Sequence, residues 1–252
     1  MAKQESIIKF TGNIGDLSFF KTKDGFSARK KTGVSGDRIR NDPQYERTRE
    51  NMEEFGRAAA ASKLVRSALR EFTRNSKDGR LTTRMTSAFL AIIKTDVVNR
   101  RGRRKVTGGN LQLIKDFQFN IGSPLNRTLQ LIITNEIVRA EARAGIVVPA
   151  FSPGTGILWP EGSTHARLMS AAVEVDFDNT RFALTTFTGE PIERQALSQP
   201  EVVISHQIPP ASELPVFLLL GVEFFQLAGS EMYPLKNGAF NSLSLVATDG
   251  GQ

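Results

Sequence analysis

The apolar residues of this chain change their spacing near residue 110, and this change limits the folds open to the chain. Between residues 45 and 93 they recur every three or four positions, as on one face of a helix. From Leu111 onward they alternate with polar residues, as in half-buried strands. We therefore predict an α+β fold, with an N-terminal β-hairpin and a helical hairpin followed by an antiparallel β-sandwich or barrel.

The part before residue 110 is expected to hold a small β element and two helices. An Asp-Gly pair at residues 24–25 separates two apolar runs and indicates a hairpin turn. Asp42 can cap a helix whose first position, Pro43, needs no N–H. The expected segments are a hairpin or small meander at 6–32, a loop at 33–41, a helix from Pro43 to about residue 72 and a helix at 81–99. The apolar face of the first helix is expected to consist of Tyr45, Met52, Phe55, Ala59, Ser62, Val65, Leu69 and Phe72.

The part after residue 110 reads as about seven strands separated by Gly, Pro and Asn turns, which is typical of an antiparallel sandwich or barrel. The segment Val216–Leu220 is apolar at every position. Such a strand is expected to be buried on both faces. The cover over it would come from the helical part or from another copy of the chain.

Charge divides the chain at nearly the same place. Residues 1–110 carry 25 Lys and Arg against 12 Asp and Glu, whereas residues 111–252 carry 8 against 14. We therefore predict two domains, a basic one at 1–110 and an acidic one at 111–252. Such asymmetry is a signature of a polyanion-binding half or of a molecule that attracts its own copies.

Two basic clusters are the candidate contacts for a polyanion or for another subunit. The stronger one lies at the predicted junction, where five of six residues are basic. Its exposed charges could release counterions from phosphates, or pair with acidic groups, or simply be solvated. The candidate residues are Arg29, Lys30 and Lys31 in the first cluster and Arg100, Arg101, Arg103, Arg104 and Lys105 in the second.

An acidic stripe is the matching candidate in the C-terminal half. Glu174, Asp176 and Asp178 alternate along one predicted strand, so their side chains are expected to share a face. A solvated edge strand explains this spacing most simply. The alternatives are a docking stripe for a basic neighbour, an acid pair, and a hard-cation site formed with Asp178 and Asn179.

The residue content argues against an enzyme. There is no cysteine, and His165 and His206 are the only histidines, which we interpret as ordinary surface or hydrogen-bonding residues. No nucleophile elbow, phosphate loop or dinucleotide-binding motif occurs. We therefore predict no catalytic, cofactor-binding or metal residues, although a hydrolase that uses only carboxylates stays open among the 26 acids.

The N-terminal sequence MAKQESIIKF has no apolar stretch long enough for a signal peptide, and no later run could span a bilayer. We expect a cytoplasmic protein without membrane insertion, with export by another signal left open.

Several segments resemble an uncharacterised family of hypothetical proteins from Bacteroidota genomes. They are Gly12–Phe19, Lys21–Phe26, Arg47–Asn51 with Glu54–Gly56, Gly221–Phe225 and Tyr233–Gly238. The resemblance implies a bacterial protein, and it carries over neither an activity nor site residues.

These features predict a non-enzymatic structural protein that self-associates into a homo-oligomer or a filament. The basic surface of one copy would meet the acidic surface of the next, with apolar strand surface at the centre of the contact. The alternative is a protein whose basic N-terminal half binds nucleic acid without reading its sequence.

Overall fold

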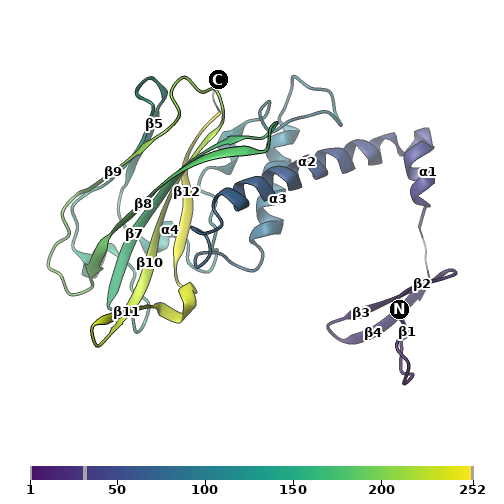
Figure 1. Cartoon of the computed structure of the whole chain (residues 1–252), viewed down its shortest axis with the longest axis horizontal. Helices are drawn as coiled ribbons and strands as arrows, with labels where there is room; N and C mark the ends of the chain where they lie inside the picture. The colour runs from purple at the N-terminus through teal and green to yellow at the C-terminus, as the bar shows by residue number, and fades with distance from the viewer. Residues whose placement is uncertain (1, 31–32, 251–252) are drawn as a thin grey trace. The chain divides into compact units, whose positions relative to one another are not determined.

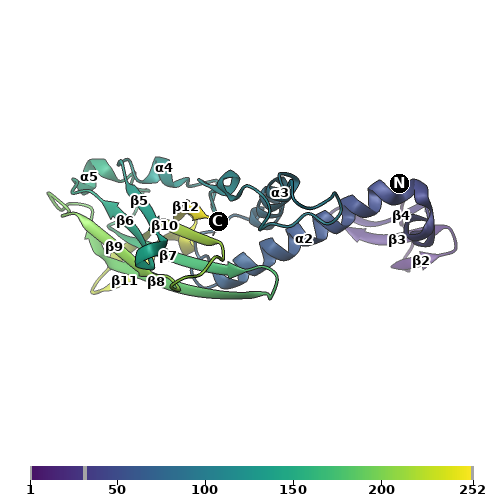
Figure 2. The same ribbon diagram turned by 90° about the horizontal axis from the view of Figure 1, so that it is seen from above.

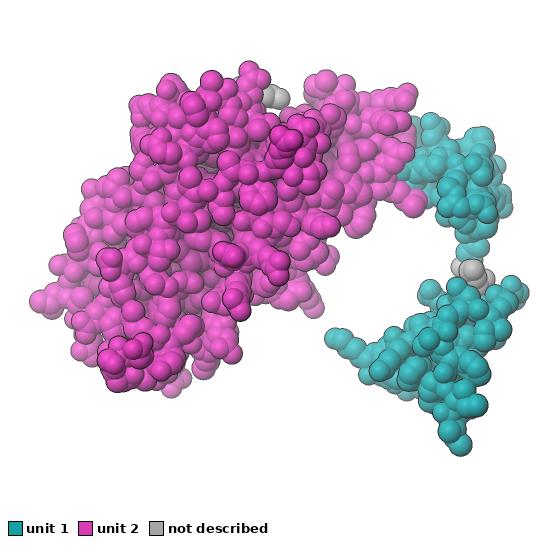
Figure 3. All heavy atoms as spheres, in the orientation of Figure 1, with its two compact units in different colours: residues 1–49 teal, residues 50–252 magenta. Residues whose placement is uncertain are grey.

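The computed structural model describes residues 2–30 and 33–250, which form two compact units, Met1–Arg49 and Glu50–Gln252 (Figure 3). The boundary lies within helix α2 (Glu46–Ala68), and not near residue 110 as predicted. The physical reason is that α2 and helix α3 (Leu81–Lys94) bury their apolar residues in one core together with C-terminal strands. The change of charge sign therefore does not mark a change of compact unit.

The smaller unit contains a four-stranded antiparallel sheet in the order β1-β4-β3-β2. Its strands are β1 (Ala2–Lys3), β2 (Gly12–Ile14), β3 (Leu17–Thr22) and β4 (Gly25–Lys30). The hairpin predicted around residues 24–25 is confirmed, because Thr22 pairs with Gly25 across the β3–β4 turn. Ile7 and Ile8 lie outside the strands, in the segment between β1 and β2.

Two short helical elements precede α2. The loop expected at 33–41 contains helix α1 (Gly36–Asn41), because the Ser35 hydroxyl caps it by accepting from the Arg38 N–H at 3.2 Å. The capping role predicted for Asp42 is confirmed: its Oδ1 accepts from the Gln44 N–H at 3.0 Å and begins the 3-10 turn η1 (Pro43–Tyr45). The long helix α2 follows directly.

Eight strands of the larger unit form two antiparallel sheets, which confirms the α+β class. The first sheet has the order β11-β10-β7-β8, with β12 also paired to β10, and the second has the order β5-β6-β9. The strands are β5 (Thr134–Val138), β6 (Arg143–Val148), β7 (His165–Asp176), β8 (Arg181–Glu193), β9 (Val202–Gln207), β10 (Val216–Ala228), β11 (Glu231–Pro234) and β12 (Ser242–Asp249).

The larger unit is built in three layers. We call the sheet of β7, β8, β10, β11 and β12 the long sheet; Figures 1 and 2 show α2 and α3 on one side of it and the sheet β5-β6-β9 on its other side. One core lies between the helices and the long sheet, and a second core lies between the two sheets. The predicted burial of both faces of Val216–Leu220 is confirmed, because Phe217 and Leu219 belong to the first core while Leu218 and Leu220 belong to the second. This apolar strand is thus covered within its own chain.

Short elements close the rest of the larger unit. They are η2 (Leu111–Ile114), α4 (Leu125–Thr128), η3 (Arg139–Glu141), α5 (Pro153–Gly156) and η4 (Leu235–Gly238). The segment 116–119 hydrogen-bonds to the outer edge of β12, where Phe119 N–H donates to the Leu243 carbonyl at 2.9 Å. Within residues 2–30 and 33–250, no helix is both long and apolar enough to cross a membrane.

Candidate interaction surfaces

The sheet of the smaller unit has one apolar face that no other element of the same unit covers. Register places Ile14 beside Leu17, and Phe19 beside Ala28, on the same face of the sheet. Phe10 packs on Phe19 with ring centroids 5.8 Å apart. Ile14 is 58% exposed, and none of these side chains is fully buried. We call this surface the N-terminal apolar face, and its residues are Phe10, Ile14, Leu17, Phe19, Phe26 and Ala28.

Basic side chains surround this sheet. Lys21 lies 5.7 Å from the ring centroid of Phe26, and Arg29 lies 5.3 Å from that of Phe20. Two predicted contact residues, Arg29 and Lys30, are exposed at the end of β4. The third, Lys31, lies outside the described residues. The exposed cations and aromatic rings give the smaller unit a surface of mixed basic and apolar character.

The basic loop, residues 100–105, is largely neutralised within its own chain. Arg101 pairs with Glu50 at 3.4 Å, and Arg104 approaches Glu54 at 3.8 Å. Lys105 pairs with Asp178 at 3.2 Å. The side chains of Arg100 and Arg103 are exposed and make no ion pair with any residue the structure describes. Two of the five predicted cations are therefore presented to solvent without an acidic partner.

Two carboxylates missed by the sequence analysis hold the basic loop in place. Glu54, only 2% exposed, accepts from the Gly102 N–H at 2.9 Å. Asp96 accepts from the N–H groups of Lys105 and Asn99 at 2.8 and 3.0 Å. Burial raises the pKa of Asp96, but these hydrogen bonds outweigh it and hold that pKa below its usual value. Asp96 also accepts from the Val98 N–H at 2.9 Å, which is an Asx turn; an Asp after a helix is a local signal for that turn but not for the contact with Lys105.

The predicted acidic stripe is not one exposed surface. The strand β7 lies between β8 and β10 and is not an edge strand, so its side chains point into the two cores. Glu174 is 7% exposed, and its Oε2 has no hydrogen-bond partner among the described residues. Asp176 accepts from the Asn179 amide at 2.7 Å, while Asp178 pairs with Lys105. The basic neighbours of the stripe thus belong to the same chain: Lys105 pairs with Asp178, and Arg181 lies opposite Asp176 in the β7–β8 register.

The two histidines differ in environment. His165 is half-buried, and its Nδ1 lies 2.9 Å from the Thr164 hydroxyl. His206 is buried between the two sheets, where its Nε2 lies 2.8 Å from the Ser170 hydroxyl and its Nδ1 3.2 Å from that of Thr185. Burial lowers the pKa of His206 and favours the neutral imidazole. This residue hydrogen-bonds as predicted, but inside the fold and not at the surface.

The strand β8 has a long open edge. It pairs only with β7, and its 13 residues make it one of the longest strands described. The Val175 N–H donates to the Pro215 carbonyl at 2.9 Å, so the backbone of Val175 faces β10. Because backbone direction alternates along a strand, Val173, Ala171 and Met169 also face β10. Their register partners on β8 therefore direct N–H and C=O groups away from β7; these partners are Leu184, Thr186 and Thr188.

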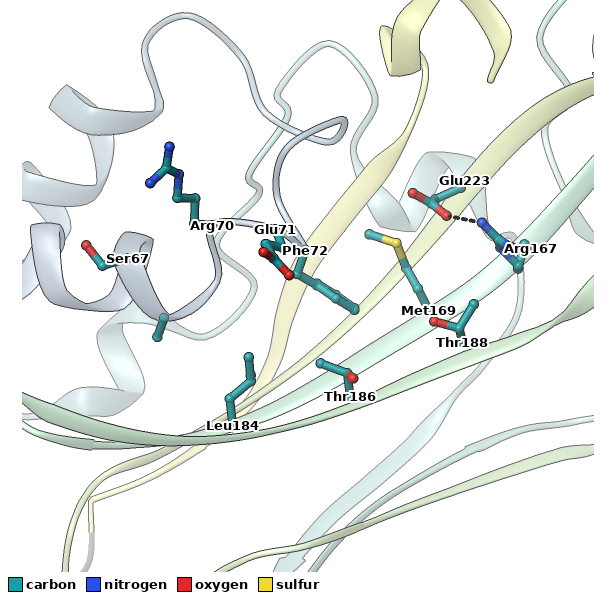
Figure 4. A pocket seen from close by; sticks show the side chains of 11 residues that line it. Ser67, Arg70, Glu71, Phe72, Arg167, Met169, Leu184, Thr186, Thr188 and Glu223 are labelled. Carbon is teal, nitrogen blue, oxygen red and sulfur yellow. Dashed lines mark hydrogen bonds and ion pairs between the residues drawn. The ribbon is translucent and has the colours of Figure 1, made fainter. Parts of the chain in front are cut away.

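Two cavities lie along the helix-facing side of β8. One, of about 590 Å³, lies between α2, the basic loop and the β7–β8 turn, and Phe182 is part of its lining. The other, of about 460 Å³, lies beside the C-terminal end of α2 and is lined by Leu184, Thr186 and Thr188. Figure 4 shows Leu184 and Thr186 on the side of the second cavity opposite Phe72, Thr188 beside Met169, and the Arg167–Glu223 ion pair at the end of the cavity. Ser67 of α2 lines both cavities, so they are neighbours along this helix.

No metal-binding cluster of three or more His, Cys, Asp or Glu residues is found in the described ranges. Comparison of the chain with protein-family models, with curated proteins and with solved structures found no match.

Proposed function

We propose that this protein is a non-enzymatic structural protein that self-associates, and that the N-terminal apolar face of one copy is covered by another copy. The observation that carries this proposal is the exposure of that face in a unit with almost no core. Of its described residues, only Ser27 is buried. A small sheet needs a covered hydrophobic face for stability, so this one gains most by docking onto another surface.

The energy scale favours apolar contact as the source of affinity. Burying one Ile or Leu side chain is worth about 1.5–3 kcal/mol, whereas an exposed ion pair contributes about 0–1 kcal/mol. The face presents Ile14 and Leu17, both strongly exposed. Charges then direct the approach and the orientation of the two copies.

The acidic half supplies a complementary surface for this contact. Residues 1–49 carry 11 Lys and Arg against 6 Asp and Glu, so the smaller unit is attracted to acidic surface. At the β10–β11 hairpin, Leu227 and Met232 are cross-strand neighbours and both are exposed. Glu231 of the same hairpin is also exposed. We propose this hairpin as the partner surface, and a contact between two different surfaces leads to chains or rings of copies.

Two neighbouring positions on β2 test the proposal. Ile14 lies on the apolar face, whereas Asn13 pairs with Ser18 on the opposite face. We expect Ile14→Asp to weaken self-association about tenfold or more, since it would bury a charge. The control Asn13→Asp adds the same charge to the other face and should leave assembly unchanged. Sedimentation velocity measures both, and equal behaviour of the two variants would contradict the proposal.

The alternative function is binding of nucleic acid without sequence readout. The observation that favours it is the exposure of Arg100 and Arg103, together with the cation–aromatic pairs on the N-terminal sheet. Binding of a single-stranded oligonucleotide should then weaken steeply as salt rises. The variant Arg100→Glu/Arg103→Glu should lower the affinity and the salt dependence. An affinity that is unchanged in this variant would remove the loop from consideration.

A further inference from the structure

The open edge of β8 is a second self-complementary surface, independent of the N-terminal unit. Leu184, Thr186 and Thr188 present unpaired N–H and C=O groups along it, and no other described strand pairs with them. Exposed edges of this length are templates for strand pairing. The other long edge, that of β12, is closed by the segment 116–119, so the chain covers one edge and leaves the other open.

We propose that β8 of one copy pairs antiparallel with β8 of a second copy, about a two-fold axis near Thr186. The inference shares with the proposed function the assumption that the chain self-associates, but it uses a different surface. In an antiparallel pair the outward residues of one strand lie opposite those of the other, so each N–H finds a carbonyl. The two long sheets then become one continuous sheet across the dimer.

The charges along β8 favour this arrangement over a parallel one. Arg181 begins the strand, whereas Glu190 and Glu193 lie near its end, and all three are exposed. An antiparallel partner places Arg181 of each copy beside the acidic end of the other, and the two-fold axis repeats this contact. A parallel partner would instead set like charges side by side, which is unfavourable. The occupant that fits the edge is therefore a second copy of the same strand.

The two cavities beside α2 provide room for the side chains of the added strand. Phe182, Leu184, Thr186 and Thr188 line the two cavities of about 590 and 460 Å³, and the equivalent side chains of the second copy would enter from the open edge. Phe182 and Leu184 are exposed in the single chain. Their burial in the dimer would add apolar contact to the backbone hydrogen bonds.

A proline substitution tests this contact without breaking the hydrogen bonds between β7 and β8. Thr186 directs its N–H outward, so Thr186→Pro removes an edge donor and blocks pairing, and edge strands tolerate proline at such positions. The substitution is made in the full chain carrying Ile14→Asp, which isolates the β8 contact. Light scattering should give the mass of two chains for Ile14→Asp alone and of one chain after Thr186→Pro is added. A dimer that persists overturns the inference, and so does an Ile14→Asp variant that is already a monomer.

Exchanging two charges provides a second test, which does not depend on how the fold tolerates a proline. In the Ile14→Asp background, we expect Arg181→Glu and Glu193→Arg each to weaken the dimer about tenfold, because each sets like charges together. The two changes combined should restore it across the two-fold axis. Failure of the combined variant to recover would overturn the antiparallel arrangement. A wild-type chain that is a monomer would overturn both this inference and the proposed function. A dimer mass that Thr186→Pro leaves unchanged would overturn this inference alone.

Discussion

At the residue scale, the basic loop is defined by contacts that no sequence pattern specifies. Gly102 adopts a φ of 81° and is buried against α2. A Cβ there would lie 2.9 Å from Cγ of Glu50, closer than side chains approach one another. The sequence predicted a basic loop at the right residues, but not that Glu54 and Asp96 would bind it, nor that Arg57 Nε would donate to the Arg104 carbonyl at 2.7 Å. These partners are up to 48 positions away, and single-sequence periodicity carries no such information.

The loop leads to a prediction about stability with a matched control. Gly102→Ala should destabilise the fold by about 1–3 kcal/mol, because its positive φ and the contact with Glu50 are both unfavourable for a side chain. Gly56→Ala, in the exposed interior of α2 with open space around it, should instead stabilise by about 0.5–1 kcal/mol. Urea unfolding of both variants measures these changes. Equal effects of the two substitutions would contradict the ordered loop.

His206 leads to a prediction about pH. Its folded-state pKa is lowered by burial, so below the ordinary value of about 6.5 the unfolded chain binds a proton that the folded chain does not. The free energy of unfolding should therefore fall by up to about 1.4 kcal/mol between pH 7.5 and 5.5. Asp78 and Asp96 do not contribute to the change in that window, because hydrogen bonds hold their pKa values below the usual value.

The control for this pH effect is His206→Asn, which keeps a polar group but removes the titration. Its unfolding free energy, measured by urea at the two pH values, should change much less than that of the wild type. A wild-type stability that is equal at pH 7.5 and 5.5 would contradict the burial of a neutral imidazole.

At the element scale, periodicity predicted well which elements form, but predicted poorly which of their faces are buried by the rest of the chain. The N-terminal hairpin, two helices and an antiparallel strand region all form as expected. However, Met52 and Phe55 are exposed, although they share the apolar spacing that buries Val65 further along α2. The pattern shows which residues share a face, but the length of helix that the sheet reaches depends on tertiary packing. The first half of the expected helix face is therefore left bare.

The strand elements show the same limit. The alternating acids were expected to share one face of an edge strand, but only Glu174 and Asp176 lie on β7, Asp178 lies in the following turn, and β7 is internal. Position in a sheet is set by pairing with distant segments, and alternation alone does not reveal it. The open edge of β8 was missed for the same reason, because its apolar residues look like those of any half-buried strand.

At the scale of the whole molecule, the chain combines a larger unit with complete cores and a smaller unit with an uncovered apolar face. The charge asymmetry seen in the sequence remains a property of the surface, because most of the acidic residues after 110 are exposed. The strand expected to form the apolar centre of a contact is covered within the chain. The contact we propose therefore moves to the N-terminal apolar face, which its own unit leaves uncovered, and to the edge of β8, which no described strand pairs with.

The mass of the wild-type protein in solution tests this account most directly. A single chain has a mass of 27.8 kDa. Size-exclusion chromatography with light scattering, at micromolar concentrations and moderate salt, should give a larger mass that rises with concentration. A constant mass of one chain over the whole concentration range would contradict self-association.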